Sequence, residues 1–406
     1  MTALRSAPRP LTHGRAEARQ QPEWSDPEEV VQVRNMLAAR PALVRAEDVL
    51  ALRALLVRVA AGQLRVVQAG DCAEDPAECT GEHIRRKVAL LDLLATAMET
   101  VSRVPALRVG RIAGQFAKPR SNPTEQVDGL TLPVYRGHMV NSPDPDPESR
   151  RADPLRILTS YAAAREAMKH LDAHREGLRP FLGAGGVVWT SHEALLLDYE
   201  EPLIRRMEDG RSWLGSTHWP WIGERTRQVD GAHVQLLADV VNPVACKVGP
   251  SMSTDEILAL CARLDPEREP GRLTLIARMS APLVADHLPP LVGKVRSEGH
   301  PVIWLCDPMH GNTVRSPSGK KTRLVEVMAQ EVRGFREAVA AAGGVAGGLH
   351  LETTPHDVTE CVADESELGL VGRRHSSLCD PRLTASQALS LLSSWAAPLS
   401  LSAAAH

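Results

Sequence analysis

The sequence lacks the features that mark several large classes of protein. Its seven cysteines are odd in number and widely spaced, and none forms a Cys-x-x-Cys pair, which argues against a disulfide scaffold and a zinc knuckle. The net charge of -3 provides no broad positive surface for nucleic acid. Residues 1–19 have no apolar signal core, and the apolar stretch 338–351 is interrupted by glycines and too short to cross a membrane. We therefore expect a cytoplasmic protein that binds neither nucleic acid nor membranes.

Nucleotide-binding motifs are also missing. The glycine-rich segments 183–186 and 343–348 do not have the G-x-G-x-x-G spacing. The segment SGKKT (318–322) resembles a phosphate-binding loop, but Val314 stands where the first glycine of that motif should be, and Lys321 where serine or threonine should follow the lysine. We do not expect a nucleotide site.

What the chain does contain is a regular alternation of strand-like and helical patterns. Its 43% apolar and 24% charged residues are typical of a globular protein. Helical periodicity is found at 82–101, 155–174, 283–297 and 322–342. Eight apolar runs are expected to be strands: 64–69, 106–112, 187–191, 216–222, 243–248, 273–277, 301–305 and 347–351. The alternation predicts an α/β fold with a parallel sheet, and eight strands would close a (β/α)8 TIM barrel; a doubly wound open sheet is the alternative.

The flanking segments suggest how the chain is divided. Two amphipathic helices, 26–39 and 46–61, precede the repeats, the first with Asp26 as its cap. We predict an N-terminal extension over 1–62 whose helices form a packing or subunit interface, a catalytic barrel over 63–396, and a loose tail over 397–406. The proline-rich segment 113–153 is expected to be an insertion after the second strand.

Polar residues stand at the end of every predicted strand, where a TIM barrel has its active site. In chain order they are Asp71 and Cys72, Arg111, His192 and Glu193, Glu224 and Arg225, Lys247, Arg278, Asp307 and His310, and Glu352.

Four of these strand-end residues are cations, and clustered cations imply an anionic ligand such as a phosphate or a carboxylate. They are Arg111, Arg225, Lys247 and Arg278, and the loop residues Lys118, Arg120 and Lys321 can reach the same place. Lys247 is also a candidate proton donor if crowding lowers its pKa. The alternative is that each cation pairs with a neighbouring acid.

A second subset combines a thiol, an imidazole and two carboxylates, which together suit a divalent ion such as Mn, Co, Fe or Zn. Its members are Cys72, His310, Glu352 and Asp380. They are far apart in the sequence, so no spacing motif supports the set, and His310 could equally be a hydrogen-bonded core histidine.

At these strand ends the sequence resembles the class II (plant-type) 3-deoxy-D-arabino-heptulosonate 7-phosphate (DAHP) synthases, over about residues 22–395. The matching segments are QAGDCAE (68–74), RVGRIAGQ (108–115), KPRS (118–121), WTSHE (189–193), WIGERTR (221–227), NP (242–243) with KVGP (247–250), DPMHGNT (307–313) and CDPRL (379–383).

The resemblance implies a (β/α)8 enzyme that condenses phosphoenolpyruvate with D-erythrose 4-phosphate and assembles as a dimer or tetramer. It implies a divalent cofactor, Mn2+ or Co2+, held by Cys72, His310, Glu352 and Asp380. It implies that phosphoenolpyruvate is bound by Arg111, Glu224 (through its backbone), Arg225, Lys247 and Arg278. It implies that Lys118, Arg120 and Ser121 hold the phosphate of erythrose 4-phosphate. The expected proton donor is Lys247, with His310 as a rival.

This chain departs from the family pattern in two places. Ser280 stands where the family usually has glycine after Arg-Met, which leaves the shape of the next loop open. The short connection between His170 and Val188 leaves no room for the helical pair that carries feedback sites in longer members, so the chain is similar to the short forms of phenazine biosynthesis. The alternatives are an aminoDAHP synthase and a non-catalytic homologue that regulates a partner such as chorismate mutase.

Overall fold

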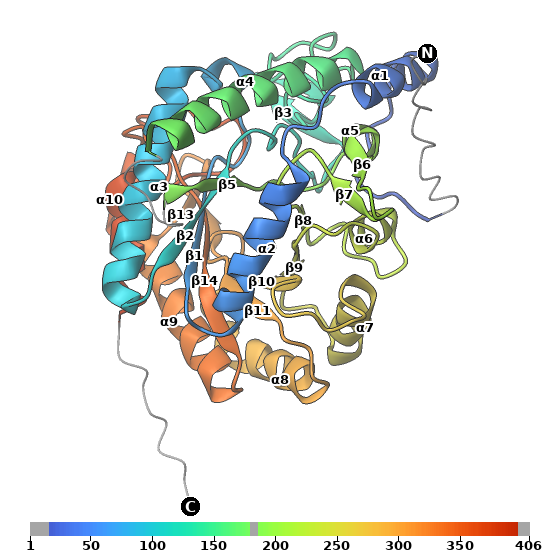
Figure 1. Ribbon diagram of the computed structural model, residues 1–406. Coiled ribbons are helices and arrows are strands. Elements are labelled where there is room, and N and C mark those ends of the chain that lie inside the picture. Colours follow the sequence, from blue (N-terminus) through green and yellow to red (C-terminus); the bar gives the residue numbers. More distant parts are fainter. Residues whose placement is uncertain (1–15, 179–185, 397–406) are drawn as a thin grey trace, which may run out of the picture.

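The computed structural model describes residues 16–178 and 186–396 (Figure 1). The predicted tail 397–406, residues 1–15 of the predicted extension and glycines 183 and 185 lie outside the described residues. No helix in the described part of the chain combines the length and apolarity that a membrane crossing requires.

Eight parallel strands follow one another around a barrel in their sequence order. They are β1 (Arg65–Gly70), β2 (Ala106–Arg111), β5 (Val188–Thr190), β8 (Trp221–Ile222), β9 (Val244–Val248), β10 (Leu273–Ala277), β11 (Ile303–Cys306) and β14 (Val345–Glu352). A parallel bridge between Glu193 and Trp221, with a hydrogen bond from Ala194 N to Trp221 O (2.9 Å), joins the end of β5 to β8. The sheet therefore closes, which confirms the predicted barrel over the open sheet.

Helices cover the outside of this barrel (Figure 1). They are α3 (Gly81–Ser102), α4 (Leu155–Leu178), α6 (Ala232–Ala238), α7 (Thr254–Leu264), α8 (Val284–Ser297), α9 (Val325–Ala341) and α10 (Ala385–Ser393). The described residues also form α1 (Pro27–Ala38) and α2 (Ala46–Ala60) before the barrel, and the short α5 (Leu197–Glu200) after β5. The carboxylate of Asp26 accepts hydrogen bonds from two amides of the first turn of α1, as the sequence predicts.

Helix α2 closes the N-terminal end of the barrel. Its residues Leu52, Leu56 and Val59 belong to one apolar cluster with the barrel interior, which includes Val66 and Ile303. All five side chains are inaccessible to solvent. The buried face of α2 is thus occupied by the barrel itself, and burial of these side chains contributes roughly 1.5–3 kcal/mol each.

Helix α1 packs on α4 and on the turn η3 (Glu201–Leu203). Its outer face exposes Val31 (58%) and Met36 (48%). Both are apolar residues of the predicted extension that remain exposed, as is Val57 of α2 (42%).

Three hairpins decorate the barrel: β3 (Thr124–Val127) with β4 (Leu130–Pro133), β6 (Ile204–Arg206) with β7 (Ser212–Leu214), and β12 (Thr313–Arg315) with β13 (Lys321–Arg323). The first lies in the insertion that follows β2, as predicted. Three predicted boundaries are wrong by more than two residues, and the first is the end of the helix predicted over 155–174, which extends to Leu178. Only 221–222 of the predicted strand 216–222 form β8, because Pro220 has no amide to donate. The predicted helix 322–342 starts at Val325 because the residues before it form β13.

Candidate active site

A cavity of about 900 Å³ opens at the carboxyl ends of the barrel strands. Its charged lining is mostly cationic: Arg111, Lys118, Arg120, Arg225, Lys247, Arg278, Arg315, Lys321 and Arg323, against Glu125, Glu193, Glu224 and Asp380. All the cations expected from the strand ends and nearby loops therefore face one space. An excess of this size favours a ligand that carries several negative charges.

Arg111 is one of the firmly held cations of this cavity. It is 2% exposed, its Nη1 lies 2.9 Å from His350 Nε2, and its Nη2 donates to Glu352 Oε1 (3.1 Å). Its guanidinium carbon also lies 5.3 Å from the centre of the Trp221 ring. Burial, with the charges of Lys247 and Arg111, holds the pKa of His350 well below its usual value, so the neutral ring accepts the hydrogen bond.

Lys247 projects from β9 and is 5% exposed. Its Nζ donates to Asp307 Oδ2 (2.5 Å), and His310 Nδ1 lies 2.7 Å from the same oxygen. Burial lowers the pKa of Lys247 to about 8 against the attraction of Asp307, and the charges of Arg111 and Arg278 add a smaller lowering. Such a lysine carries its charge at neutral pH and can still release a proton, which is what a general acid requires.

The remaining barrel candidates are oriented by their neighbours. Arg278 Nη2 donates to the carbonyl of His310 (2.9 Å). Glu224 Oε1 accepts from Arg227 Nη2 (2.8 Å), while its Oε2 makes no hydrogen bond with any described residue. Arg225 Nη2 donates to Ser121 Oγ (2.6 Å), which connects the barrel to the insertion loop.

The insertion loop holds its cations close to the strand ends. Lys118 is 6% exposed, and its Nζ lies 3.5 Å from Glu352 Oε1 and 3.4 Å from Asp380 Oδ2. Arg120 pairs with Glu125 of β3 (3.1 Å). Lys118, Arg120 and Ser121 thus all line the cavity.

Buried Glu74 gives this loop its shape. Its carboxylate accepts hydrogen bonds from the amides of Ala113 (3.0 Å), Gly114 (2.8 Å) and Gln115 (2.8 Å), which turn the chain immediately after β2. Gly114 has no alternative at this turn, because a Cβ there would collide with the ring of His192. The turn leads directly to Lys118.

Three of the four predicted metal ligands converge. Ligand atoms of His310, Glu352 and Asp380 all lie within 4.8 Å of one another, and His310 Nε2 is 3.3 Å from Glu352 Oε1. Cys72 lies beside this group rather than in it: its Sγ accepts a hydrogen bond from the amide of Asp380 (3.4 Å).

The charge state of these groups fits a divalent ion. Burial raises the pKa of Glu352, but the charges of His310, Lys118 and Arg323 outweigh that effect and hold this pKa well below its usual range. A hydrogen bond with Cys379 lowers the pKa of Cys72 to about 6 despite burial, so the thiolate is available at neutral pH. A thiolate, an imidazole and two carboxylates are the donors that Mn2+, Co2+, Fe2+ or Zn2+ accepts.

The loop that carries Asp380 is held by a buried ion-pair network. Arg382 Nη1 donates to Asp71 (2.7 Å), and its Nη2 donates to Glu360 (2.9 Å). Glu360 also accepts from the amide of Ser377 (2.8 Å). Because Asp71 precedes Cys72, this network places the last predicted ligand next to the first.

The contact between Cys72 and Cys379 leads to a redox prediction. In metal-free protein treated with diamide, these thiols are expected to join as a disulfide, since a thiolate and a thiol are already hydrogen-bonded. Alkylation followed by mass spectrometry should then find five of the seven cysteines free. Cys379→Ser provides the control, and seven alkylated thiols in the oxidised wild type would refute the pairing.

Several residues of the cavity could not be assigned a role from the sequence, and Arg323 and Glu193 are two of them. Arg323, on β13, is 1% exposed and donates to Glu352 Oε2 (2.8 Å); it was hidden because its segment was predicted to be helical. Glu193 lines the cavity, and its Oε1 makes no hydrogen bond with any described residue. Burial raises the pKa of this carboxyl, although the positive charge of Lys118 acts to lower it.

Ser280 has a backbone conformation that glycine adopts more readily than serine. Its φ is 76°, in the left-handed region, and its amide is held by Glu331 Oε1 (2.9 Å). The same carboxylate oxygen accepts from the amide of Met279 (2.8 Å). The loop after Arg278 is therefore fixed by Glu331.

Comparison with known proteins identifies the family. The profile described as Class-II DAHP synthetase family matches residues 9–180 and 185–396. The chain belongs to this family. A protein of Pseudomonas fluorescens named probable phospho-2-dehydro-3-deoxyheptonate aldolase is 56% identical over 383 residues, covering 94% of this chain and 96% of the relative.

More distant relatives agree over nearly the whole chain. A Streptomyces coelicolor protein named phospho-2-dehydro-3-deoxyheptonate aldolase is 40% identical, covering 92% of this chain and 93% of its own. An aldolase of the same name (AroG) from Mycolicibacterium smegmatis is 39% identical and covers 92% and 90%. The solved structure of such an aldolase from Francisella tularensis is similar in fold, with a TM-score of 0.52 at 12% identity, covering 93% of this chain and 97% of that one.

Proposed function

We propose that this class-II family member condenses phosphoenolpyruvate with D-erythrose 4-phosphate and water to give DAHP and phosphate, the first step of the shikimate pathway. Membership of the family and relatives of that name support the reaction. The observation that carries the assignment to this site is the cation-lined cavity beside His310, Glu352 and Asp380. Two phosphorylated substrates need an excess of positive charge of this kind.

We assign phosphoenolpyruvate to the barrel side of the cavity and erythrose 4-phosphate to the loop side. The barrel set is Arg111, Arg225, Lys247 and Arg278, with the backbone of Glu224. The loop set is Lys118, Arg120 and Ser121. The hydrogen bond between Arg225 and Ser121 marks the boundary between the two sets, and this proximity supports reaction between their ligands.

A divalent ion, which we propose to be Mn2+ or Co2+, would be held by Cys72, His310, Glu352 and Asp380, and when bound would supply Lewis-acid polarisation of the aldehyde oxygen. In the reaction, carbon 3 of phosphoenolpyruvate attacks the aldehyde carbon and water adds at carbon 2. The resulting phosphohemiketal loses phosphate by C–O cleavage. Lys247 is the proposed donor of a proton to the former aldehyde oxygen, and Asp307 holds its ammonium in place.

The lowered pKa of Lys247 predicts how activity depends on pH. Below about pH 8 the ammonium is charged and binds the phosphoenolpyruvate anion; as the pH rises above that value the charge is lost. The kcat/KM for phosphoenolpyruvate should therefore fall about tenfold per pH unit on the alkaline side. Lys247→Arg cannot lose its charge in this range, so any activity it retains should lack this alkaline limb, and an unchanged limb would contradict the assignment.

The test of the proposed function is phosphate release from phosphoenolpyruvate by the full-length protein, with erythrose 4-phosphate as the only second substrate. EDTA should abolish the release, and added Mn2+ or Co2+ should restore it. Turnover only with an imino or amino analogue of the sugar phosphate would identify an aminoDAHP synthase. Absence of turnover with either would favour a non-catalytic regulator, which the presence of Lys247 and all four proposed ligands argues against.

The short connection after α4 predicts an enzyme without aromatic feedback control. Phosphate release should keep at least about 80% of its rate when Phe, Tyr and Trp are added together. This is expected of an enzyme that provides precursors for phenazines or similar secondary products. The Mycolicibacterium smegmatis relative, assayed in parallel, serves as a comparison. Strong inhibition of this chain would contradict the specialised pathway and leave the catalytic proposal intact.

Assembly and location are further expectations from the family. We propose a cytoplasmic dimer or tetramer in which Val31 and Met36 of α1 contribute to a subunit contact, because both are exposed apolar residues on one helix. A chorismate mutase is the expected partner if one exists. Analytical ultracentrifugation of the wild type and of a Val31→Glu variant tests the subunit contact.

A further inference from the structure

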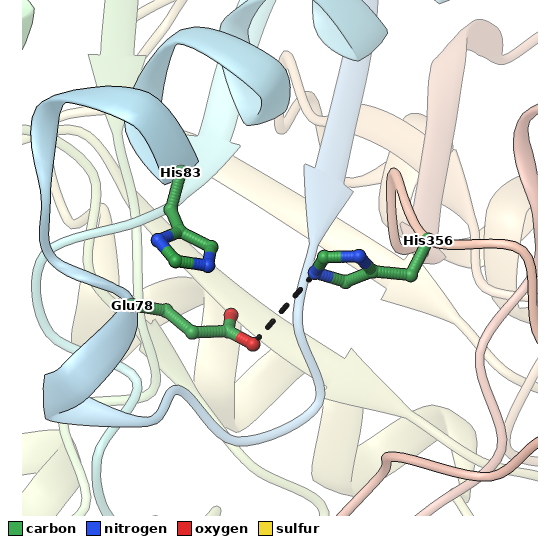
Figure 2. Close-up of side chains that lie close together, drawn as sticks. All are labelled: Glu78, His83 and His356. Atoms are coloured by element: carbon green, nitrogen blue, oxygen red, sulfur yellow. Dashed lines mark ion pairs between the residues drawn. The ribbon is translucent and has the colours of Figure 1, made fainter.

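A second group of potential metal ligands lies outside the cavity (Figure 2). Glu78 ends the turn η1 (Pro76–Glu78), His83 is in the first turn of α3, and His356 is in the loop after β14. Each offers a ligand atom, and these atoms lie within 4.8 Å of one another. His356 Nε2 is 3.9 Å from Glu78 Oε1, and the two imidazole rings are 6.2 Å apart at their centres.

Two of the three side chains, those of His83 and Glu78, are oriented by neighbours that leave one donor atom of each available. Thr80 Oγ1 lies 2.8 Å from His83 Nδ1, so the other ring nitrogen is free to face the group. Lys87 Nζ lies 3.2 Å from Glu78 Oε2, which leaves Oε1 directed at His356. Figure 2 shows a nitrogen of each ring turned toward the carboxylate. Partners that fix a ligand through its second atom are a regular feature of metal sites.

We propose that Glu78, His83 and His356 form a second site for a divalent ion of the zinc class, separate from the catalytic centre. Two imidazoles and one carboxylate are a recognised ligand set for Zn2+ and for neighbouring transition ions, with water in the remaining positions. The side chains of His356 and Glu78 are 31% and 24% exposed, so an ion can reach the site from solvent. An ordinary surface pair of histidine and glutamate does not account for the second imidazole.

An ion at this site would connect the segments that follow the first and the last strand of the barrel. It ties the segment between β1 and α3 to the segment after β14, which also leads to Asp380. Lys87 links the site to the catalytic side, because its Nζ contacts both Glu78 (3.2 Å) and Asp71 (2.7 Å), the residue before Cys72. The site is therefore a clamp, in the sense that its ion would hold these two segments together. It would support the catalytic ligands without sharing any of them.

The test measures zinc stoichiometry in the metal-stripped full-length protein, by calorimetric titration and by elemental analysis after desalting. Wild type should bind two equivalents and His356→Ala one, while His375→Ala, a change at an exposed histidine outside the group, should bind two. Circular dichroism of the metal-free proteins checks that each variant is folded. Equal stoichiometry in wild type and His356→Ala would overturn the proposal.

Cobalt separates the two sites. In His356→Ala the near-ultraviolet band from a cysteine thiolate to cobalt should remain, since Cys72 is untouched. A wild type that binds one ion and a His356→Ala variant that binds none would support the second site while contradicting the catalytic metal.

Zinc should also raise the Tm of Cys72→Ser by a few degrees, an increase that the Cys72→Ser/His356→Ala double variant should lose. No increase in the single variant would contradict the clamp.

Discussion

Replacing Lys247 by alanine is expected to lower kcat at least about 1,000-fold while the barrel stays folded. The ammonium is buried, is held by Asp307 at 2.5 Å, and lies among the cations that we assign to phosphoenolpyruvate. Alanine removes both a charge that binds the phosphate or carboxylate and the proposed proton donor. The loss should therefore appear in kcat as well as in KM, measured by phosphate release.

Stability should change little, which separates this loss from unfolding. The pKa of Lys247 is lowered to about 8, so at neutral pH the buried charge costs the native state free energy, a cost that declines as the pH rises from about 8 toward the unfolded value. Asp307 keeps its contacts with His310 and the amide of Met309 (3.0 Å) in the variant. The Tm of Lys247→Ala is thus expected to lie near that of the wild type.

The matched control is Lys294→Ala, which removes an exposed lysine from α8. It should retain full activity. Retention of more than about a tenth of the wild-type kcat by Lys247→Ala would contradict both proposed roles of the residue.

The sequence was sufficient to predict the barrel because strands that follow one another along the chain are also neighbours in the sheet. Each apolar run is followed by a polar residue at the carboxyl end of the strand, and parallel register then sets these ends at one level. Gly70 of β1 pairs with Arg111 of β2 and with Glu352 of β14, so the residues around all three positions meet at the same rim. Strand counting and register place residues in this way without any knowledge of their side-chain contacts.

What the sequence could not supply are contacts between loops. His350 could have been predicted to be a residue of the site, because it stands two residues before Glu352 and lies on the same face of β14. Arg323 could not, because the hairpin that carries it is defined by pairing with Thr313. The approach of His356 to His83 depends likewise on how the loop after β14 meets the start of α3 at the rim. No periodicity in the sequence predicts that contact.

Replacing Cys72 by serine is expected to weaken binding of the catalytic ion at least about 100-fold, or about 2.7 kcal/mol. The thiol has a pKa of about 6, because a hydrogen bond with Cys379 and the charge of Lys118 favour the thiolate against burial. A serine hydroxyl in the same place stays protonated at neutral pH and is a harder donor, so it retains the size of the thiol without its charge. Activity should fall in step with metal occupancy and recover in part at high Mn2+ or Co2+.

Cys379→Ser is the matched control for this prediction. It changes the adjacent thiol to the same hydroxyl, which can still donate a hydrogen bond to Cys72, and it removes no proposed ligand. Metal affinity, measured by competition with a chelator, should therefore be nearly unchanged, and the near-ultraviolet thiolate-to-cobalt band should persist in Cys379→Ser and vanish in Cys72→Ser. Full activity of Cys72→Ser in metal-depleted buffer would remove Cys72 from the ligand set. Because Cys72 lies beside the group formed by His310, Glu352 and Asp380 rather than within it, that result would leave a three-ligand site of one imidazole and two carboxylates.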